Sequence, residues 1–348
     1  MTADARATDP LIKKINKFVK DNIPLLKNIE SFLDNSQNDI IYRIEKSYKL
    51  NMYLSNVKIM IITANEIERD TLFAFFAKNT RYCIKKIGRG NLIFSFIKIG
   101  SNDVVHIEPT STGSYTKGGT GRIIKKAIKI AKPNIVISAG VAFGLRPNKD
   151  TLGDVLIGRQ HFSYDKGAKI SEGKINIKRL HIEEPDEYML CRIQATIPTE
   201  KPICGRFQNM FNVILGNMLT GEFVIDFEQF KNMILSPFES FGVVGGEMEA
   251  YGLFEEIKNQ NKVHCILIKG ICDWGSGKNT IDKVDELKYN VKNDLQILAM
   301  LNTCEVCQRF LITEHLFSDE AIRGLKKKFW RIGIGKIISK LCCQSIEL

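Results

Sequence analysis

Apolar side chains recur at intervals of three and four residues near the start of the chain. The clearest run places five of them on one helical face: Leu11, Ile12, Ile15, Phe18 and Val19. This period is typical of an amphipathic helix, and no strand-like alternation is found up to residue 55. We therefore predict a helical N-terminal extension over residues 1–55.

From Val57 onwards the pattern changes to short apolar runs separated by polar loops. Val57–Ala64 predicts a buried strand, and Asn65–Phe76 predicts the helix that follows it. Further elements are predicted along the chain: a hairpin of Ile93–Ile99 and Val104–Ile107, a helix at Gly121–Ala131, a strand at Asn134–Ala139, a glycine-containing turn at Gly140–Leu145, strands at Asp154–Ile157 and Val263–Gly270, and helices at Ala250–Asn259 and Lys283–Phe310. Strands that alternate with helices indicate an α/β domain whose sheet is covered on both faces.

This pattern divides the chain into a catalytic-sized domain at residues 56–317 and a basic amphipathic tail at residues 318–348. The longest apolar runs, such as Val57–Ile62 and Ile135–Ala142, are far shorter than the roughly 20 residues that span a bilayer. The N-terminus lacks the basic start and apolar stretch of a secretory signal. We therefore expect no membrane association and a cytoplasmic location.

Composition adds a positive charge and little sign of metal binding. The chain has 50 basic and 39 acidic residues, a formal net charge of +11, which favours an anionic partner. No nucleic-acid-binding signature accompanies this charge, so we do not expect nucleic acid as the partner. The nine cysteines and five histidines lack disulfide-framework or metal-ligand spacing, apart from the isolated pair Cys304 and Cys307. We predict neither a metal nor a cofactor.

Carboxylates cluster at two points near the end of the predicted domain. Gly245–Ala250 contains Glu247, Met248 and Glu249 at a loop that enters a helix, and Ile268–Asp273 is a buried strand that ends in an aspartate. Taken alone, Glu249 is a common helix-start acid and Asp273 a common strand-end residue. Their joint occurrence favours a functional site.

These segments, taken in order, resemble the nucleoside phosphorylase and nucleosidase superfamily, and within it the methylthioadenosine/S-adenosylhomocysteine nucleosidases. The resemblance runs from Val57 to Phe317 and leaves out both ends. Its matching segments are Val57–Glu68, the glycine turn Ser138–Leu145, the strand Gly153–Gly158, Glu247–Glu249 and Lys269–Asp273. The resemblance implies a three-layer α/β/α domain with a central mixed sheet, and an enzyme that breaks the bond between a purine and its ribose.

The resemblance also implies roles for particular residues. Asp273 matches the acid that protonates the purine N7, and it would have to hold its proton near neutral pH. Glu249 matches the carboxylate that accepts hydrogen bonds from the ribose hydroxyls, and Met248 would pack against the sugar. Glu68 matches the carboxylate that orients the attacking water. Lys269 stands where the family has an arginine near that water, so it keeps the charge and loses the planar fork.

The remaining predicted substrate contacts are carried by weaker matches. Phe223 resembles the aromatic residue that stacks on the base, although the same residue also fits a core position. Val224 resembles the residue whose backbone reads the base edge. Gly140, in the glycine turn, Phe162, which follows the matched strand, and Glu247 complete the predicted set.

The loop at residues 109–122 departs most from the family pattern. It is rich in glycine and hydroxyl residues and opens a helix, and it carries Lys117 and Arg122. Free backbone N–H groups and a helix N-terminus with these two cations would form a cradle for phosphate. A surface loop without a ligand fits the same residues. The cradle would imply a substrate with 5′-phosphate groups, such as AMP or ATP.

The predicted function is hydrolysis of a purine nucleoside or nucleotide, with adenine favoured. Ser138 and Ala139 stand where phosphorylases of the superfamily carry an arginine, which favours water over phosphate as the acceptor. A phosphate-dependent phosphorylase and a purine-nucleotide sensor without activity are the two alternatives. Superfamily members form homo-oligomers, and some with extra helical segments degrade nucleotides in bacterial antiphage defence, so the resemblance implies both properties here.

Overall fold

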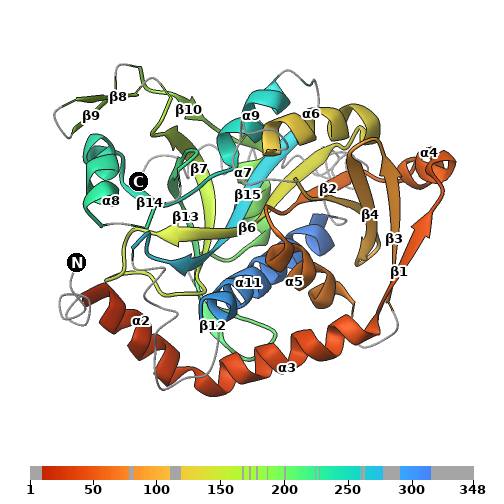
Figure 1. Ribbon diagram of the computed structural model, residues 1–348, viewed down its shortest axis with the longest axis horizontal. Helices are drawn as coiled ribbons and strands as arrows, with labels where there is room; N and C mark the ends of the chain where they lie inside the picture. Colours follow the sequence, from red (N-terminus) through yellow and green to blue (C-terminus); the bar gives the residue numbers. More distant parts are fainter. Residues whose placement is uncertain are drawn as a thin grey trace, which may run out of the picture.

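The chain folds into three layers, with helices on both faces of a central mixed sheet, in a computed structural model (Figure 1). This arrangement confirms the predicted fold class. The structure describes residues 10–77, 82–109, 119–166, 168–171, 174–177, 179–185, 187–199, 201–223, 225–226, 228–258, 260, 263–276 and 291–314.

The central sheet has eleven strands, and two small two-stranded sheets lie outside it. In spatial order the strands are β1 (Ile40–Glu45), β3 (Tyr82–Arg89), β4 (Leu92–Ile99), β5 (Asn102–Ile107), β2 (Ile59–Ile62), β6 (Ile135–Gly144), β14 (Val243–Glu247), β13 (Val213–Thr220), β7 (Val155–Ser163) and β10 (Ile182–Glu183), with β15 (His264–Asp273) paired to both β6 and β7. The small sheets pair β8 (Ala168–Ser171) with β9 (Lys174–Ile177) and β11 (Ile203–Cys204) with β12 (Met210–Phe211).

Five of these strands close on themselves. Because β15 pairs with β6 on one side and β7 on the other, β6, β14, β13, β7 and β15 form a hydrogen-bonded ring. Within the ring Lys269 of β15 lies opposite Gly140 of β6, and Asp273 lies opposite Phe143. The ring therefore fixes in register five of the predicted site residues: Gly140, Phe162, Glu247, Lys269 and Asp273.

Helices bury both faces of the sheet, which explains its continuous apolar strands. In β2, Ile59 and Ile61 belong to the cluster under one helical layer, and Met60 and Ile62 belong to the cluster under the other. The first layer contains α2 (Pro10–Asp21), α3 (Ile23–Asp39), α5 (Glu66–Phe76), α7 (Glu187–Thr196) and α11 (Val291–Glu314); the second contains α4 (Leu50–Leu54), α6 (Thr120–Ala131) and α9 (Ala250–Lys258). Outside these layers lie α8 (Glu228–Leu235), η1 (Ser47–Lys49) and η2 (Ser236–Phe241).

Most predicted elements are confirmed, with shifts at their ends. They include β2 followed by α5, the antiparallel pair β4 and β5, and the later elements α6, β7, α9 and β15. Helix α11 begins at Val291 and continues to Glu314, while the earlier part of its predicted range and the predicted tail lie outside the described residues. No helix in the described ranges is long and apolar enough to cross a membrane.

Three predictions about local structure were wrong. The N-terminal extension does contain a strand, β1, which pairs in parallel with β3 at the sheet edge. The predicted turn at Gly140–Leu145 is the second half of strand β6, because β15 pairs with β6 past Gly140 as far as Phe143. Residues Gly245–Glu247, predicted in a loop, form part of β14 between β6 and β13. Each strand depends on a partner far away in sequence, which local periodicity does not detect.

Candidate functional site

The carboxylates singled out from the sequence gather where β2, β6, β14 and β15 end. Glu68 comes from the first turn of α5, and Glu249 lies between β14 and α9. Lys269 and Asp273 both belong to β15, and all four side chains are buried. The structure therefore brings Glu68 and Glu249 to Lys269 from distant parts of the chain, and Asp273 follows four residues further along β15.

Glu68 is fixed by the way α5 begins. Asn65 caps this helix, and its side chain accepts a hydrogen bond of 3.0 Å from the Glu68 N–H. The Glu68 carboxylate in turn accepts hydrogen bonds from the backbone N–H groups of Ala64 at 2.6 Å and Val141 at 3.0 Å. A Cβ added at Gly140 would lie 2.7 Å from the Glu68 Oε1 atom, so the glycine permits this approach.

Lys269 forms the centre of the cluster. Its ammonium donates a hydrogen bond of 3.0 Å to Glu249 Oε2 and lies 3.9 Å from Glu247 Oε2. Burial alone would lower the pKa of Lys269, but Glu249, Glu68 and Glu247 outweigh burial and raise it. Lys269 is therefore a fixed positive charge inside an acidic cluster.

The carboxylates around Lys269 differ in protonation. Burial raises the pKa of Glu68 to about 7, against the opposing attraction of Lys269. Burial also acts to raise the pKa of Glu249, but the charge and hydrogen bond of Lys269 outweigh it and lower that pKa. Near neutral pH, Glu249 is a carboxylate, and Glu68 is poised to accept or release a proton.

Glu247 points into the protein and caps α9. Its carboxylate accepts hydrogen bonds from the backbone N–H groups of Glu249 at 2.7 Å and Ala250 at 3.0 Å. Burial and the neighbouring Glu249 charge raise the pKa of Glu247 to about 8. The carboxylate oxygens of Glu247, predicted to contact the substrate, are thus already engaged at the start of α9.

Asp273 is the last residue of β15, four residues beyond Lys269. Its Oδ1 atom accepts a hydrogen bond of 2.7 Å from the Gly275 N–H, and its Oδ2 atom lies 3.2 Å from the Cys272 thiol. The following residue, Trp274, is buried, and its carbonyl accepts a 3.3 Å hydrogen bond from Lys231 of α8. These contacts hold the end of the strand and the direction of the Asp273 carboxyl group.

The other predicted residues are less closely associated with this cluster. Phe223 is 56% exposed, which excludes the core alternative and leaves its ring accessible. Phe162 is fully buried against Phe238 and Phe241, so it exposes no surface to a ligand. Met248 is half-buried. Arg122 is exposed in the first turn of α6. Val224 and Lys117 lie outside the described residues.

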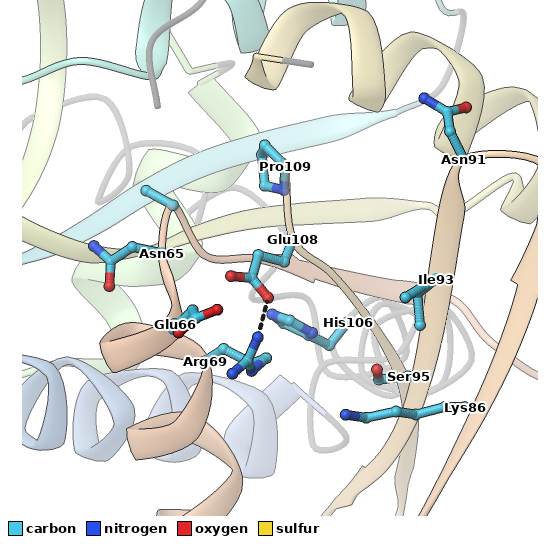
Figure 2. Close-up of a pocket in the computed structure, with 11 residues that line it drawn as sticks. Asn65, Glu66, Arg69, Lys86, Asn91, Ile93, Ser95, His106, Glu108 and Pro109 are labelled. Carbon is cyan, nitrogen blue, oxygen red and sulfur yellow. Dashed lines mark hydrogen bonds and ion pairs between the residues drawn. The ribbon is translucent and has the colours of Figure 1, made fainter. Parts of the chain in front are cut away.

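A cavity of about 480 Å³ opens beside Glu68, and sequence reasoning missed most of its lining (Figure 2). It begins at Ala64 and Asn65 and extends along side chains from β3, β4 and β5. The lining residues with polar side chains are Asn65, Glu66, Arg69, Lys86, Asn91, Ser95, His106 and Glu108. Only Asn65 had a usable sequence signal, because an asparagine three residues before a glutamate is typical of a helix start.

The described residues contain no group of three or more histidine, cysteine, aspartate or glutamate side chains placed to hold a metal ion. The buried cluster carries its own cation in Lys269. The arrangement can therefore supply a proton donor, a fixed carboxylate and a base from the protein's own side chains.

No family model matches the chain. Among solved structures, the methylthioadenosine/S-adenosylhomocysteine nucleosidase of Neisseria meningitidis is 17% identical with a TM-score of 0.55, and the alignment covers 73% of this chain and 97% of that one. The futalosine hydrolase of Helicobacter pylori strain 26695 is 14% identical with a TM-score of 0.55, covering 74% and 98%. The chain thus shares its fold with these two solved structures.

The chain is also similar in sequence to a curated protein. The death domain-containing ATP nucleosidase of the sponge Amphimedon queenslandica is 23% identical over 201 residues. The match covers 52% of this chain, and the chain spans only 36% of the length of that relative.

Proposed function

We propose that the chain hydrolyses the N-glycosidic bond of a purine nucleoside or nucleotide and releases the free base. The observation that carries the proposal is the buried arrangement of Glu68, Lys269 and Glu249, with Asp273 at the end of the same strand as Lys269. Together they supply an acid for the base, a negative charge for the sugar and a proton acceptor for water.

The proposed reaction assigns one step to each side chain. Asp273 protonates the purine N7, so that the bonding electrons of the C1′–N9 bond leave with the base. Glu249 accepts hydrogen bonds from the ribose hydroxyls and stabilises the positive charge that develops on the sugar. Glu68 takes a proton from the water whose oxygen bonds to C1′. A pKa of about 7 suits this acceptor role at neutral pH.

Lys269 serves this scheme as a positioning residue. Its hydrogen bond holds the Glu249 carboxylate, and its charge keeps Glu249 ionised within a buried site. An arginine would do the same with two donors, whereas a lysine directs its single ammonium at Glu249. The lysine therefore preserves the charge balance of the site.

Hydrolysis is favoured over phosphorolysis by the position of Glu68. This carboxylate accepts hydrogen bonds from the backbone N–H groups of Ala64 and Val141. Those N–H groups would otherwise be available to bind an incoming phosphate. A carboxylate in that place also repels an anion. A purine-nucleotide sensor that does not cleave its ligand would not need an acid such as Asp273.

Adenine nucleotides are the preferred substrates in our proposal. The methylthioadenosine/S-adenosylhomocysteine nucleosidase of Colwellia psychrerythraea was solved with adenine, at 16% identity and a TM-score of 0.56 over 74% of this chain and 95% of that one. The sponge relative is an ATP nucleosidase by name. Depletion of nucleotides in antiphage defence, and homo-oligomer formation, remain predictions from the sequence resemblance.

The proposal is tested by incubating the purified protein with adenosine, methylthioadenosine, AMP and ATP and with the matching guanine and hypoxanthine compounds. Free base is followed by chromatography, with and without phosphate. We expect base release that does not depend on phosphate. An Asp273→Asn variant keeps the shape of the side chain, and we expect it to fold, to bind ligand and to lose about 10² or more in turnover.

Two results would contradict this scheme. Release that requires phosphate, with ribose 1-phosphate as product, would make the protein a phosphorylase. Full turnover by the Asp273→Asn variant would remove Asp273 from the reaction.

A further inference from the structure

The cavity beside Glu68 contains a positive charge that the reaction does not use. Lys86 of β3 extends into the cavity from the side opposite α5 (Figure 2). Its ammonium lies 3.8 Å from the centre of the Tyr42 ring of β1, and it is half-buried. Within the described ranges no carboxylate lies within ion-pair distance of Lys86.

The second cation of the cavity is already neutralised. Arg69 of α5 contacts Asp70 at 2.8 Å and Glu108, which follows β5, at 2.8 Å. Glu66 stands at the exposed mouth, where water screens its charge. Of the two cations in the described lining, Lys86 is the one whose ammonium is not held in an ion pair.

Neutral polar side chains line the same cavity as Lys86. His106 is buried and hydrogen-bonded to the Thr63 hydroxyl at 2.9 Å, and burial lowers its pKa to about 3, so it carries no charge near neutral pH. Ser95 and the side-chain amides of Asn65 and Asn91 also line the cavity. Hydroxyl and amide N–H groups around a single ammonium suit the oxygens of a phosphate.

The cavity is connected to the proposed reaction centre by one residue. Ala64 lines its inner end, and the Ala64 N–H donates to the Glu68 carboxylate. The cavity therefore adjoins the loop whose backbone holds the Glu68 carboxylate. The volume of about 480 Å³ exceeds that needed for one phosphate group.

We propose that this cavity holds the 5′-phosphate groups of a nucleotide substrate, with Lys86 as the residue that binds the anion. This inference rests on the proposed function and narrows its substrate class to nucleotides. It places the phosphate contact on Lys86 of β3.

A Lys86→Met variant tests the proposal, because it removes the charge and keeps most of the side-chain length. Steady-state kinetics are measured for adenosine, AMP and ATP. We expect KM for AMP and ATP to rise by about tenfold or more, the loss typical of one charged hydrogen bond, while KM for adenosine stays unchanged. A Lys86→Arg variant should recover most of the affinity for both nucleotides.

Lys85→Met is the matched control. Lys85 directly precedes Lys86 in β3, so its side chain points to the opposite face of the sheet. Its ammonium lies 4.8 Å from the Tyr53 ring centre. We expect it to behave like the unmodified protein with all three substrates. Circular dichroism and thermal unfolding of both variants exclude misfolding as the cause of a change in KM.

The outcomes separate this inference from the proposed function. If base is released but Lys86→Met alters adenosine and ATP equally, or alters neither, the cavity is not the phosphate site and the enzymatic function stands. If no substrate releases base, ATP binding is measured by calorimetry. ATP binding that depends on Lys86 would support the phosphate site and contradict the proposed hydrolysis. The absence of ATP binding would contradict both the phosphate site and the proposed hydrolysis.

Discussion

Glu68 and Glu249 lie near the same buried ammonium, yet only Glu249 forms a hydrogen bond with it. Lys269 therefore keeps Glu249 ionised, while burial dominates at Glu68 and raises its pKa to about 7. The difference follows from geometry, because Glu68 is directed toward the N–H groups of Ala64 and Val141. The two glutamates thus have pKa values shifted in opposite directions.

This difference predicts how activity depends on pH. Turnover should fall as the pH drops through about 7, because protonated Glu68 can no longer accept a proton from water. Glu68→Gln should lose about 10² or more in turnover together with this acidic limb. The measurement is kcat against pH, with adenosine as substrate so that the ionisation of phosphate groups does not interfere. An unchanged acidic limb in the variant would assign the limb to another group.

The same group affects stability with a defined sign. The folded pKa of Glu68, about 7, lies above its ordinary value of 4.5, so the folded state binds more protons between these values. Its contribution is complete below pH 4.5 and is lost as the pH rises toward 7, a loss on the order of 3 kcal/mol. Denaturant unfolding at acidic and neutral pH should therefore show a smaller pH dependence in Glu68→Gln than in the unmodified chain.

At the scale of elements, helix α11 packs directly against β15, the strand that carries Lys269 and Asp273. A Cβ added at Gly270 would lie 2.2 Å from the Ala299 carbonyl oxygen of α11. On the same helix, the Thr303 hydroxyl donates a hydrogen bond to the Gly140 carbonyl at 3.1 Å. The helix therefore touches β15, which carries Lys269 and Asp273, and β6, whose Val141 N–H holds Glu68.

Gly270→Ala should consequently destabilise the fold, because a backbone carbonyl cannot move aside as a side-chain terminus can. We expect a loss of about 1–3 kcal/mol in the free energy of unfolding, measured with denaturant. Gly88→Ala on β3 is the control, because an added Cβ there meets no atom within 4 Å. Equal stabilities of the two variants would show that α11 can shift away from β15.

The sequence predicted elements with strong local patterns and missed those defined by distant partners. Strand β2 and helix α5 carry unbroken apolar runs and a capping signal, so they could be located. Strand β1 pairs with β3 about forty residues later, and its burial alternates poorly. Glu68, Glu249, Lys269 and Asp273 stand in motifs, whereas the Lys86 side chain reaches the cavity only through the pairing of β3 with β4.

For the whole molecule, the net charge of +11 should favour anionic substrates over neutral ones. Raising the salt concentration from about 0.05 M to about 0.5 M shortens the range of electrostatic attraction from over 10 Å to a few Å. We expect KM for ATP to rise severalfold over this interval and KM for adenosine to remain constant. An equal response of both substrates would mean that salt acts on the fold or on the reaction instead of on the approach of the anion.

The closed ring of β6, β14, β13, β7 and β15 has a consequence for how such a protein can change over evolution. Every strand in the ring is hydrogen-bonded on both sides, so the groups that it carries keep their spacing when surrounding segments are replaced. The cavity, in contrast, lies outside the ring, between the start of α5 and the strands β3, β4 and β5. Under the proposed function, substitutions on these three strands would change which nucleotide is admitted and leave the spacing of Lys269 and Asp273 unchanged.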